Sequence, residues 1–303
     1  MEWLRQVWTD VNLTSVELFE TENSAHVLAE PATLDGDGEI STVQLLHQTL
    51  AEAVLEKYNS TVLSSDLRLP SGQDSIRFDQ IVGFVAGNRM LNDDILRFTL
   101  LLMAEQLTTS QTLVFSPHAP MLGFPRPPQH TRLTSVSFMI LPVFFSSSNH
   151  WGIIIVEVDM DMPTPTIYVF YYESIGADSY LSVMKEIWNK KLLAHLKLWY
   201  VQDCDDRARA EGFPFTVVEE AISVPLQPDG TSCGVMVIAM AYSYLTGNRD
   251  FPLHKVTKAY VACMRLRILW MVMTKAVIEP IPQLIKEHAS KTNKELKKAL
   301  GRH

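Results

Sequence analysis

The chain has 303 residues, of which 47% are hydrophobic and 20% charged. This composition excludes a disordered chain, a collagen and a coiled-coil rod, and the length suffices for one large domain or two modest ones. The net charge of -8 is unevenly spread, because residues 1–40 carry nine acids and one base, whereas residues 281–303 carry six bases and two acids. The chain between them is close to neutral for its size, which argues against nucleic acid as a substrate.

Two features of the sequence bear on where the protein works. Its start has an acid at position 2 and no apolar core, unlike a secretory signal. The longest apolar stretch, residues 259–278, is interrupted by Arg265, Arg267 and Lys275, which predicts a buried amphipathic helix and no membrane span. We therefore expect an intracellular protein of the nucleus or cytoplasm, without a membrane partner.

The elements predicted along the chain are helices and strands mixed without βαβ regularity, so the expected fold class is α+β. Hydrophobic periodicity, caps and turn residues define these elements. They are a helix from a capping box at Ser41, a boundary at residues 69–72, a helix opened by Asn92 or Asp93, a proline-rich surface loop over 116–128, a strand over 138–145, a hairpin of strands 150–158 and 166–172, a helix around 181–198, a short strand over 221–225, a buried helix over 235–245 ended by Gly247, and a closing helix over about 255–276.

These elements divide the chain into three parts. Residues 1–75 form an acidic, partly helical extension, residues 76–280 form the main domain, and residues 281–303 form a basic tail. We expect the basic tail to be a solvated helix end.

The cysteines raise the question of a nucleophile. Cys204, Cys233 and Cys263 are an odd number without a CxxC pair, which argues against a disulfide scaffold and a zinc site. Cys233 follows a glycine-containing turn and begins a helix, where the partial positive charge of the helix N-terminus stabilises a thiolate. A free cysteine is also commonly a small buried apolar residue, so position alone leaves both interpretations of Cys233 open. Cys204 lies among acids and Cys263 within an apolar helix, so we expect both to be structural.

A thiolate nucleophile needs an imidazole, and the imidazole needs an orienting carboxylate. His150 opens a strand directly after a polar loop, where its side chain can reach a cleft; His118, His130 and His195 lack this setting. If the hairpin is centred between residues 161 and 162, His150 faces Glu173 across the strand pair, within hydrogen-bond reach.

An acyl-transfer site also needs donors for the oxyanion. Gln227 lies six residues before Cys233, and its amide and the backbone N–H of Cys233 are the candidates. Gly230 and Gly234 would let a substrate backbone approach closely.

Three motifs, in this order, resemble the ubiquitin-like-protein-specific cysteine proteases, the SUMO (sentrin) proteases and their deneddylase and adenoviral relatives. They are Met90-Leu-Asn-Asp-Asp-Ile95, His150-Trp151 and Gln227-Pro-Asp-Gly-Thr-Ser-Cys-Gly234. The resemblance covers roughly residues 76–275 and implies a papain-like core with a central mixed or antiparallel sheet flanked by helices. Two positions depart from the family pattern: Glu173 stands where most members have Asp, although adenoviral relatives have Glu, and Met90 replaces a Trp.

The resemblance implies a function and roles for the motif residues. The enzyme would cleave after the C-terminal Gly-Gly of SUMO or a related modifier, in precursors or conjugates, without metal or cofactor, and we expect a monomer. Cys233 would be the nucleophile, His150 the general base, Glu173 the third triad member and Gln227 an oxyanion donor. Trp151 and Met90 would wall a channel for the Gly-Gly tail, and Asp93 would contact the body of the modifier.

Two other functions remain open at this point. Related acetyltransferases use a His-Glu-Cys triad on the same fold with acetyl-coenzyme A, and Glu173 slightly favours that reading, whereas Trp151 and the Leu-Asn-Asp motif do not. Alternatively, Met90 and Glu173 mark a weak site that still binds a modifier without turning it over.

Overall fold

The computed structural model describes residues 52–54, 56–85, 89–107, 111–128, 131–203, 212–247, 249, 251 and 256–276. The predicted capping box at Ser41, the basic tail, His130 and Cys204 lie outside these residues. Along the described stretches, none of the helices combines the length and the apolar character that crossing a bilayer requires.

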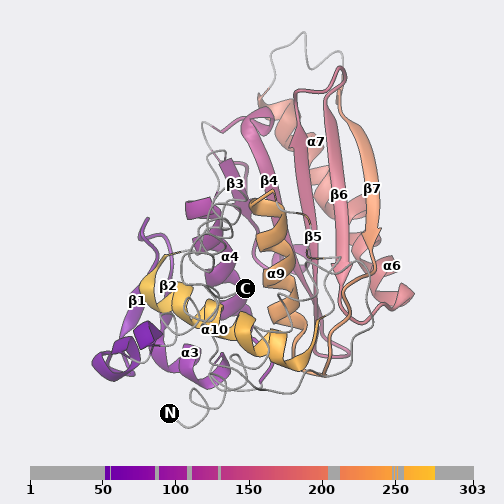
Figure 1. Ribbon diagram of the computed structural model, residues 1–303. Helices are drawn as coiled ribbons and strands as arrows, with labels where there is room; N and C mark the ends of the chain where they lie inside the picture. Colours follow the sequence, from indigo (N-terminus) through magenta and orange to yellow (C-terminus); the bar gives the residue numbers. More distant parts are fainter. Residues whose placement is uncertain are drawn as a thin grey trace, which may run out of the picture.

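A five-stranded mixed sheet, in the order β3-β4-β5-β6-β7, lies at the centre of the structure (Figure 1). The three inner strands form an antiparallel meander, whereas each edge strand runs parallel to its neighbour. The inner strands are rich in β-branched and aromatic residues and almost wholly buried, as in sheets that are covered on both faces. The strands are β3 (Gln111–Val114), β4 (Val136–Phe145), β5 (His150–Asp159), β6 (Thr166–Glu173) and β7 (Thr216–Ile222).

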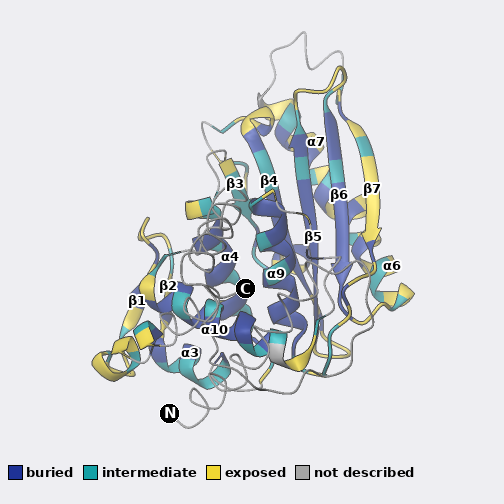
Figure 2. Ribbon diagram, in the orientation of Figure 1, coloured by how far each residue is buried: buried dark blue, intermediate teal, exposed yellow. Residues whose placement is uncertain are grey.

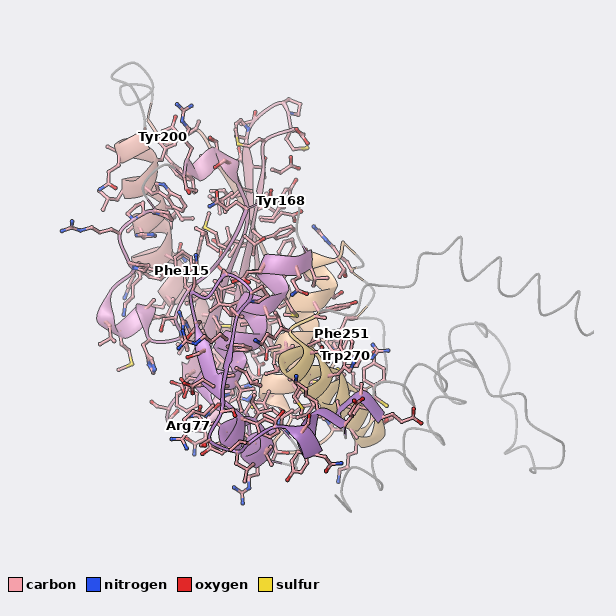
Figure 3. All side chains as sticks on the ribbon, turned by 90° about the vertical axis from the view of Figure 1, so that its left-hand side faces the viewer. Arg77, Phe115, Tyr168, Tyr200, Phe251 and Trp270 are labelled. Carbon is pink, nitrogen blue, oxygen red and sulfur yellow. The ribbon has the colours of Figure 1, made fainter. Side chains whose placement is uncertain are left out.

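Helices cover both faces of this sheet, so the protein has two apolar cores. In β5, Ile153 and Ile155 belong to the core on the side of α9, whereas Ile154 and Val156 belong to the core on the side of α6 and α7. Figure 3 shows α7, with Tyr200, and α10, with Trp270, on opposite sides of the sheet. The helices are α3 (Phe78–Phe84), α4 (Asp93–Leu107), α5 (Ala119–Leu122), α6 (Asp178–Ile187), α7 (Leu193–Asp203), α9 (Cys233–Leu245) and α10 (Lys258–Thr274).

Helix α9 is the most deeply buried helix, and Figure 2 shows it dark blue along most of its length. It is apolar all round because it packs against the sheet on one side and against α4 and α10 on the other. Gly247, with φ of 70°, follows its last turn and donates its N–H to the carbonyl of Tyr244, as predicted for a glycine at a helix end.

The segment before α3 packs onto the same core. Strands β1 (Asp66–Arg68) and β2 (Ser75–Arg77) form an antiparallel hairpin, and Leu67, Leu69 and Ile76 are buried in the core that contains α4. Residues 69–72, expected to be a boundary, form the turn of this hairpin, where Gly72 adopts a φ of 74°. The expected division after residue 75 therefore falls inside β2.

Most of the other predicted elements are present, with three differences in extent. Asn92 is the N-cap of α4, since its side chain accepts the backbone N–H of Ile95 at 3.0 Å. The loop over 116–128 contains the short helix α5, and the helix expected around 181–198 is interrupted by a π-helical turn (Trp188–Leu192) between α6 and α7. The strand expected over 221–225 begins and ends earlier, as β7, because an exposed edge strand carries polar residues that hide its pattern.

Candidate active site

The candidate nucleophile, Cys233, is the first residue of α9 and is only 1% exposed. The loop before it is organised by the carboxylate of Asp229, which accepts the backbone N–H of Thr231 at 2.8 Å and the hydroxyl of Ser232 at 2.6 Å. Burial alone would raise the pKa of Asp229, but these donors hold it below its usual value. The charged Asp229 therefore fixes the turn from which α9 begins.

The candidate base, His150, is the first residue of β5 and is also buried. Its Nε2 lies 3.2 Å from Oε2 of Glu173, and its side chain forms a hydrogen bond with that of Cys233. Burial lowers the pKa of the imidazole, but the hydrogen bonds with Cys233 and Glu173 outweigh burial and raise it to about 9. Because Nε2 faces Glu173, Nδ1 is the nitrogen available to the thiol.

Two aromatic rings hold the imidazole in place. The ring of Phe145 stacks on His150 with centroids 5.7 Å apart, and the ring of Tyr180, from α6, lies 4.9 Å away. Gly152 allows this arrangement, since a Cβ there would lie 3.0 Å from the Phe145 ring. None of these three residues was predicted from the sequence; of them, only Gly152 carried a signal, as a glycine within an otherwise β-branched strand.

The candidate third member, Glu173, is the last residue of β6. Its two carboxylate oxygens accept the backbone N–H groups of Ile175 at 2.9 Å and Ala177 at 2.7 Å. Burial raises the pKa of Glu173, but the hydrogen bond with His150 and these two backbone donors outweigh it, and the pKa is lowered. The carboxylate is therefore charged and oriented toward the imidazole.

The exact register predicted for the hairpin was wrong. Glu173 lies opposite Gly152, and His150 lies opposite Phe145 of β4. The hairpin loop is centred one residue later than expected, which moves the pairing by two positions and leaves the same side chains on the same face. His150 and Glu173 are therefore diagonal neighbours, and they still meet because the imidazole and the glutamate side chain span the diagonal.

Gln227 lies in the loop between β7 and α9, five residues beyond the end of β7. Its side-chain oxygen accepts the hydroxyl of Ser174 at 2.7 Å, and its amide nitrogen donates to the carbonyl of Asp229 at 2.6 Å. Its backbone N–H also donates to the carbonyl of Ser174. Gln227 is thus held between the residue that follows Glu173 and the loop that precedes Cys233.

The expected channel residues lie beside the start of α4. Trp151 is buried, and its indole N–H donates to the carbonyl of Leu91 at 2.9 Å. Phe144, 43% exposed, lies against Trp151 with ring centroids 4.7 Å apart, and Met90 is half-buried against the same core. Trp151 thus ties the strand that carries His150 to the segment that carries Met90.

The other residues predicted to bind substrate, Asp93, Gly230 and Gly234, differ in their exposure and contacts. Asp93 is partly exposed, and its carboxylate lies 2.9 Å from Nε2 of His118. Gly230 is exposed, with open space where a Cβ would project. At Gly234 a Cβ would lie 3.0 Å from that of Leu91, so the absence of a side chain lets α9 pack closely against the segment before α4.

Other titratable groups of the described chain lie apart from this site. Cys263 is buried in α10, and burial raises its pKa to about 11, as expected for a structural thiol. His195 stacks on Phe124 at 5.2 Å, and burial lowers its pKa. Among the described residues, no group of His, Cys, Asp and Glu side chains is arranged to hold a metal ion.

Comparison with known proteins identifies the fold. Neither a family model nor a curated protein matches the sequence. Among solved structures, the Ulp1 protease domain in complex with Smt3, the yeast orthologue of SUMO, matches with a TM-score of 0.50 and 19% identity, over 76% of this chain and 94% of that chain. A structure of the SUMO protease Ulp1 with its catalytic cysteine oxidised to a sulfenic acid matches with a TM-score of 0.47 and 18% identity, over 78% and 98% of the two chains. A de-sumoylating protease matches with a TM-score of 0.47 and 16% identity, over 71% and 92%.

The first of these likenesses agrees with the fold expected from the sequence. The chain has an α+β fold with a central mixed sheet, helices on both faces and Cys233 at a helix N-terminus, and it shares the fold of the Ulp1 protease domain.

Proposed function

We propose that this protein is a cysteine protease that cleaves after the C-terminal Gly-Gly of SUMO or a related ubiquitin-like modifier. The observation that carries the proposal is the position of His150, which forms hydrogen bonds with both Cys233 and Glu173. An imidazole between a thiol at a helix N-terminus and a charged carboxylate is the arrangement that activates a cysteine nucleophile.

The proposed reaction uses each of these groups in turn. Nδ1 of His150 takes the proton of Cys233, and the thiolate attacks the glycine carbonyl. The amide of Gln227 and the backbone N–H of Cys233 stabilise the resulting oxyanion. As the C–N bond breaks, the imidazolium gives its proton to the leaving amine. Water, deprotonated by His150, then hydrolyses the thioester and releases the modifier.

The burial of Cys233 supports a Gly-Gly substrate. Because the residue is only 1% exposed, a substrate must approach it closely, which favours a chain with little side-chain bulk next to the scissile carbonyl. Glycine has no Cβ, so its backbone approaches a buried group more closely than that of any other residue. The shared fold adds to this support, because the Ulp1 domain was solved in complex with a SUMO orthologue.

Modifier probes with an electrophile at the C-terminus test this proposal. We expect a SUMO probe to form an adduct with the wild type and with Cys263→Ala, which removes a buried thiol outside the site, but not with Cys233→Ala. Turnover of a SUMO conjugate should fall at least about 10⁴-fold in Cys233→Ala, as for other triad nucleophiles. A ubiquitin probe run in parallel identifies the modifier.

Three outcomes would contradict the proposal. Self-acetylation of Cys233 by acetyl-coenzyme A, without probe adducts, would favour the acetyltransferase. Modifier binding that is unchanged in Cys233→Ala, with no turnover in the wild type, would favour the binding module. Alkylation of Cys233 by iodoacetamide, without reaction with either probe, would argue against any protease of this class.

A further inference from the structure

Helix α10 carries a buried arginine beside the candidate active site. Arg265 is 1% exposed, although arginine is almost never fully buried unless it is paired. Within the described ranges no carboxylate forms an ion pair with it, and its Nε has no hydrogen-bond partner there. Burying a guanidinium in this way costs stability that an apolar side chain of similar volume would not cost. The position therefore calls for a reason other than core packing.

The contacts of Arg265 join three separate segments. Its guanidinium donates to the carbonyl of Arg89 at 2.7 Å, and to those of Phe84 and Thr231 at 3.3 Å each. Phe84 ends α3, Arg89 directly precedes Met90, and Thr231 lies two residues before Cys233. One side chain thus holds the segment before Met90 and the loop before the nucleophile at a fixed separation.

The charge of Arg265 also acts on the nucleophile. Burial lowers the pKa of the guanidinium, while the negative charges of Asp229 and of a Cys233 thiolate act in the opposite direction. The guanidinium bonds the carbonyl of Thr231, two residues before Cys233, so its positive charge lies close to the nucleophile. The other charged groups that bear on this region are Asp229 in the loop, His150 on β5 and Glu173 on β6. Arg267, two residues further along α10, acts on Cys263.

We propose that Arg265 is a positioning residue for the reaction above, which holds the nucleophile loop against the segment before Met90 and supplies a buried positive charge to the Cys233 thiolate. The role of Arg265 in turnover rests on the proposed function. Its effect on the Cys233 thiolate does not, because that effect is independent of any substrate.

Three variants separate the charge of Arg265 from its hydrogen bonds. Arg265→Gln removes the charge but keeps an amide donor, whereas Arg265→Lys keeps the charge but loses the planar fork. Arg267→Gln is the matched control, since Arg267 lies on the same helix and its Nε is likewise buried without a partner among the described residues. Alkylation of Cys233 by iodoacetamide is followed against pH by mass spectrometry of its peptide. Thiolate absorbance, taken as the difference from the matching Cys233→Ala protein, gives a second pH profile.

We expect Arg265→Gln to shift both pH profiles upward and to slow Cys233 alkylation at neutral pH about tenfold, the effect of losing one nearby opposite charge. Arg265→Lys should keep the wild-type pH profile but lower the turnover of a SUMO conjugate about tenfold, because the two segments are no longer held by a fork. Arg267→Gln should leave both pH profiles and turnover unchanged.

A folded Arg265→Gln protein with the wild-type pH profile would overturn the electrostatic role. If Arg265→Gln does not fold, Arg265→Lys decides: a pH profile shifted upward, or unchanged turnover, would overturn the proposal. Shifted thiolate profiles without any reaction toward modifier probes would overturn the protease function and leave the role of Arg265 intact.

Discussion

The two halves of the candidate active site are built in different ways. The strand half, His150 and Glu173, comes from the adjoining ends of β5 and β6, and backbone amides and aromatic rings fix its side chains. The helix half, Gln227 and Cys233, comes from one loop and the helix that follows it, and distant residues such as Leu91 and Arg265 hold it in place. Local strand pairing thus orients the candidate base, whereas long-range packing orients the candidate nucleophile. Damage to the strand half should therefore change the chemistry of the imidazole, and damage to the helix half should also change stability.

The strongest test of the strand half is Glu173→Gln, which keeps the shape of the side chain and removes its charge. Turnover should fall at least about a hundredfold, because the imidazolium loses its partner. The pKa of His150, raised to about 9 in the wild type partly by Glu173, should fall, so the alkaline limb of the pH–rate profile should move to lower pH. Glu219→Gln is the control, since Glu219 bonds the hydroxyl of Tyr171 at 2.7 Å and does not contact His150. An unmoved alkaline limb in Glu173→Gln would show that Glu173 does not set the pKa of the imidazole.

The same pair predicts how stability varies with pH. The pKa of His150 is raised above 6.5, so its contribution is complete below pH 6.5 and is lost as the pH rises through about 9. The pKa of Glu173 is lowered, so its contribution is complete above pH 4.5 and is lost as the pH falls through its pKa in the folded protein. Urea unfolding across this range should show both losses in the wild type, and a weaker loss on the acidic side in Glu173→Gln.

A smaller effect is expected from Tyr180→Ala, which removes one of the two rings beside His150. We expect turnover to fall about tenfold with little change in KM, because a less constrained imidazole is less often aligned with the thiol. Tyr180→Phe keeps the ring and should retain wild-type turnover. Equal losses in the two variants would assign the effect to the hydroxyl and not to the stacked ring.

The smallest effect is expected from a methyl group added to the helix half. Gly234→Ala places a Cβ about 3.0 Å from that of Leu91, and overpacking of this kind costs about 1–3 kcal/mol. Alanine regains about 1 kcal/mol through its helix propensity, so we expect a net loss of up to about 2 kcal/mol in urea unfolding. Gly230→Ala, which meets open space, should be neutral. Equal stability of the two variants would contradict the packing role of Gly234.

The strand half could be predicted well because its signals are local in the sequence. A histidine that opens a β-branched strand and a glutamate that ends the next strand suffice to pair the two residues. The loop centre was predicted one residue too early, which shifts the register by two residues. A shift of two leaves every side chain on the same face of the sheet, so the two residues still meet. The length of the hairpin loop, which sets that step, has no signal in a run of Asp, Met, Pro and Thr.

For the helix half, the sequence indicated which residues react, but not which residues hold them in place. The turn before Cys233 indicated a nucleophile. Arg265, which holds that turn, also bonds a segment that lies 181 residues away from it in the sequence. Arg265 was visible in the sequence as a charge within an apolar helix, and served there only to exclude a membrane span. Which buried carbonyls a guanidinium meets depends on the packing of three segments, and no periodicity encodes it.

The parallel pairing of β7 with β6 has a consequence for the order of folding. The antiparallel meander of β4, β5 and β6 closes through short connections, whereas β7 joins only after the chain has passed through α6 and α7. Closing a long connection costs more chain entropy, so contacts between distant segments form late. We therefore expect His150 and Glu173 to meet on a growing chain before Cys233 docks beside them. On the ribosome, such a chain would therefore hold the candidate base and its carboxylate partner in place before the candidate nucleophile reaches them.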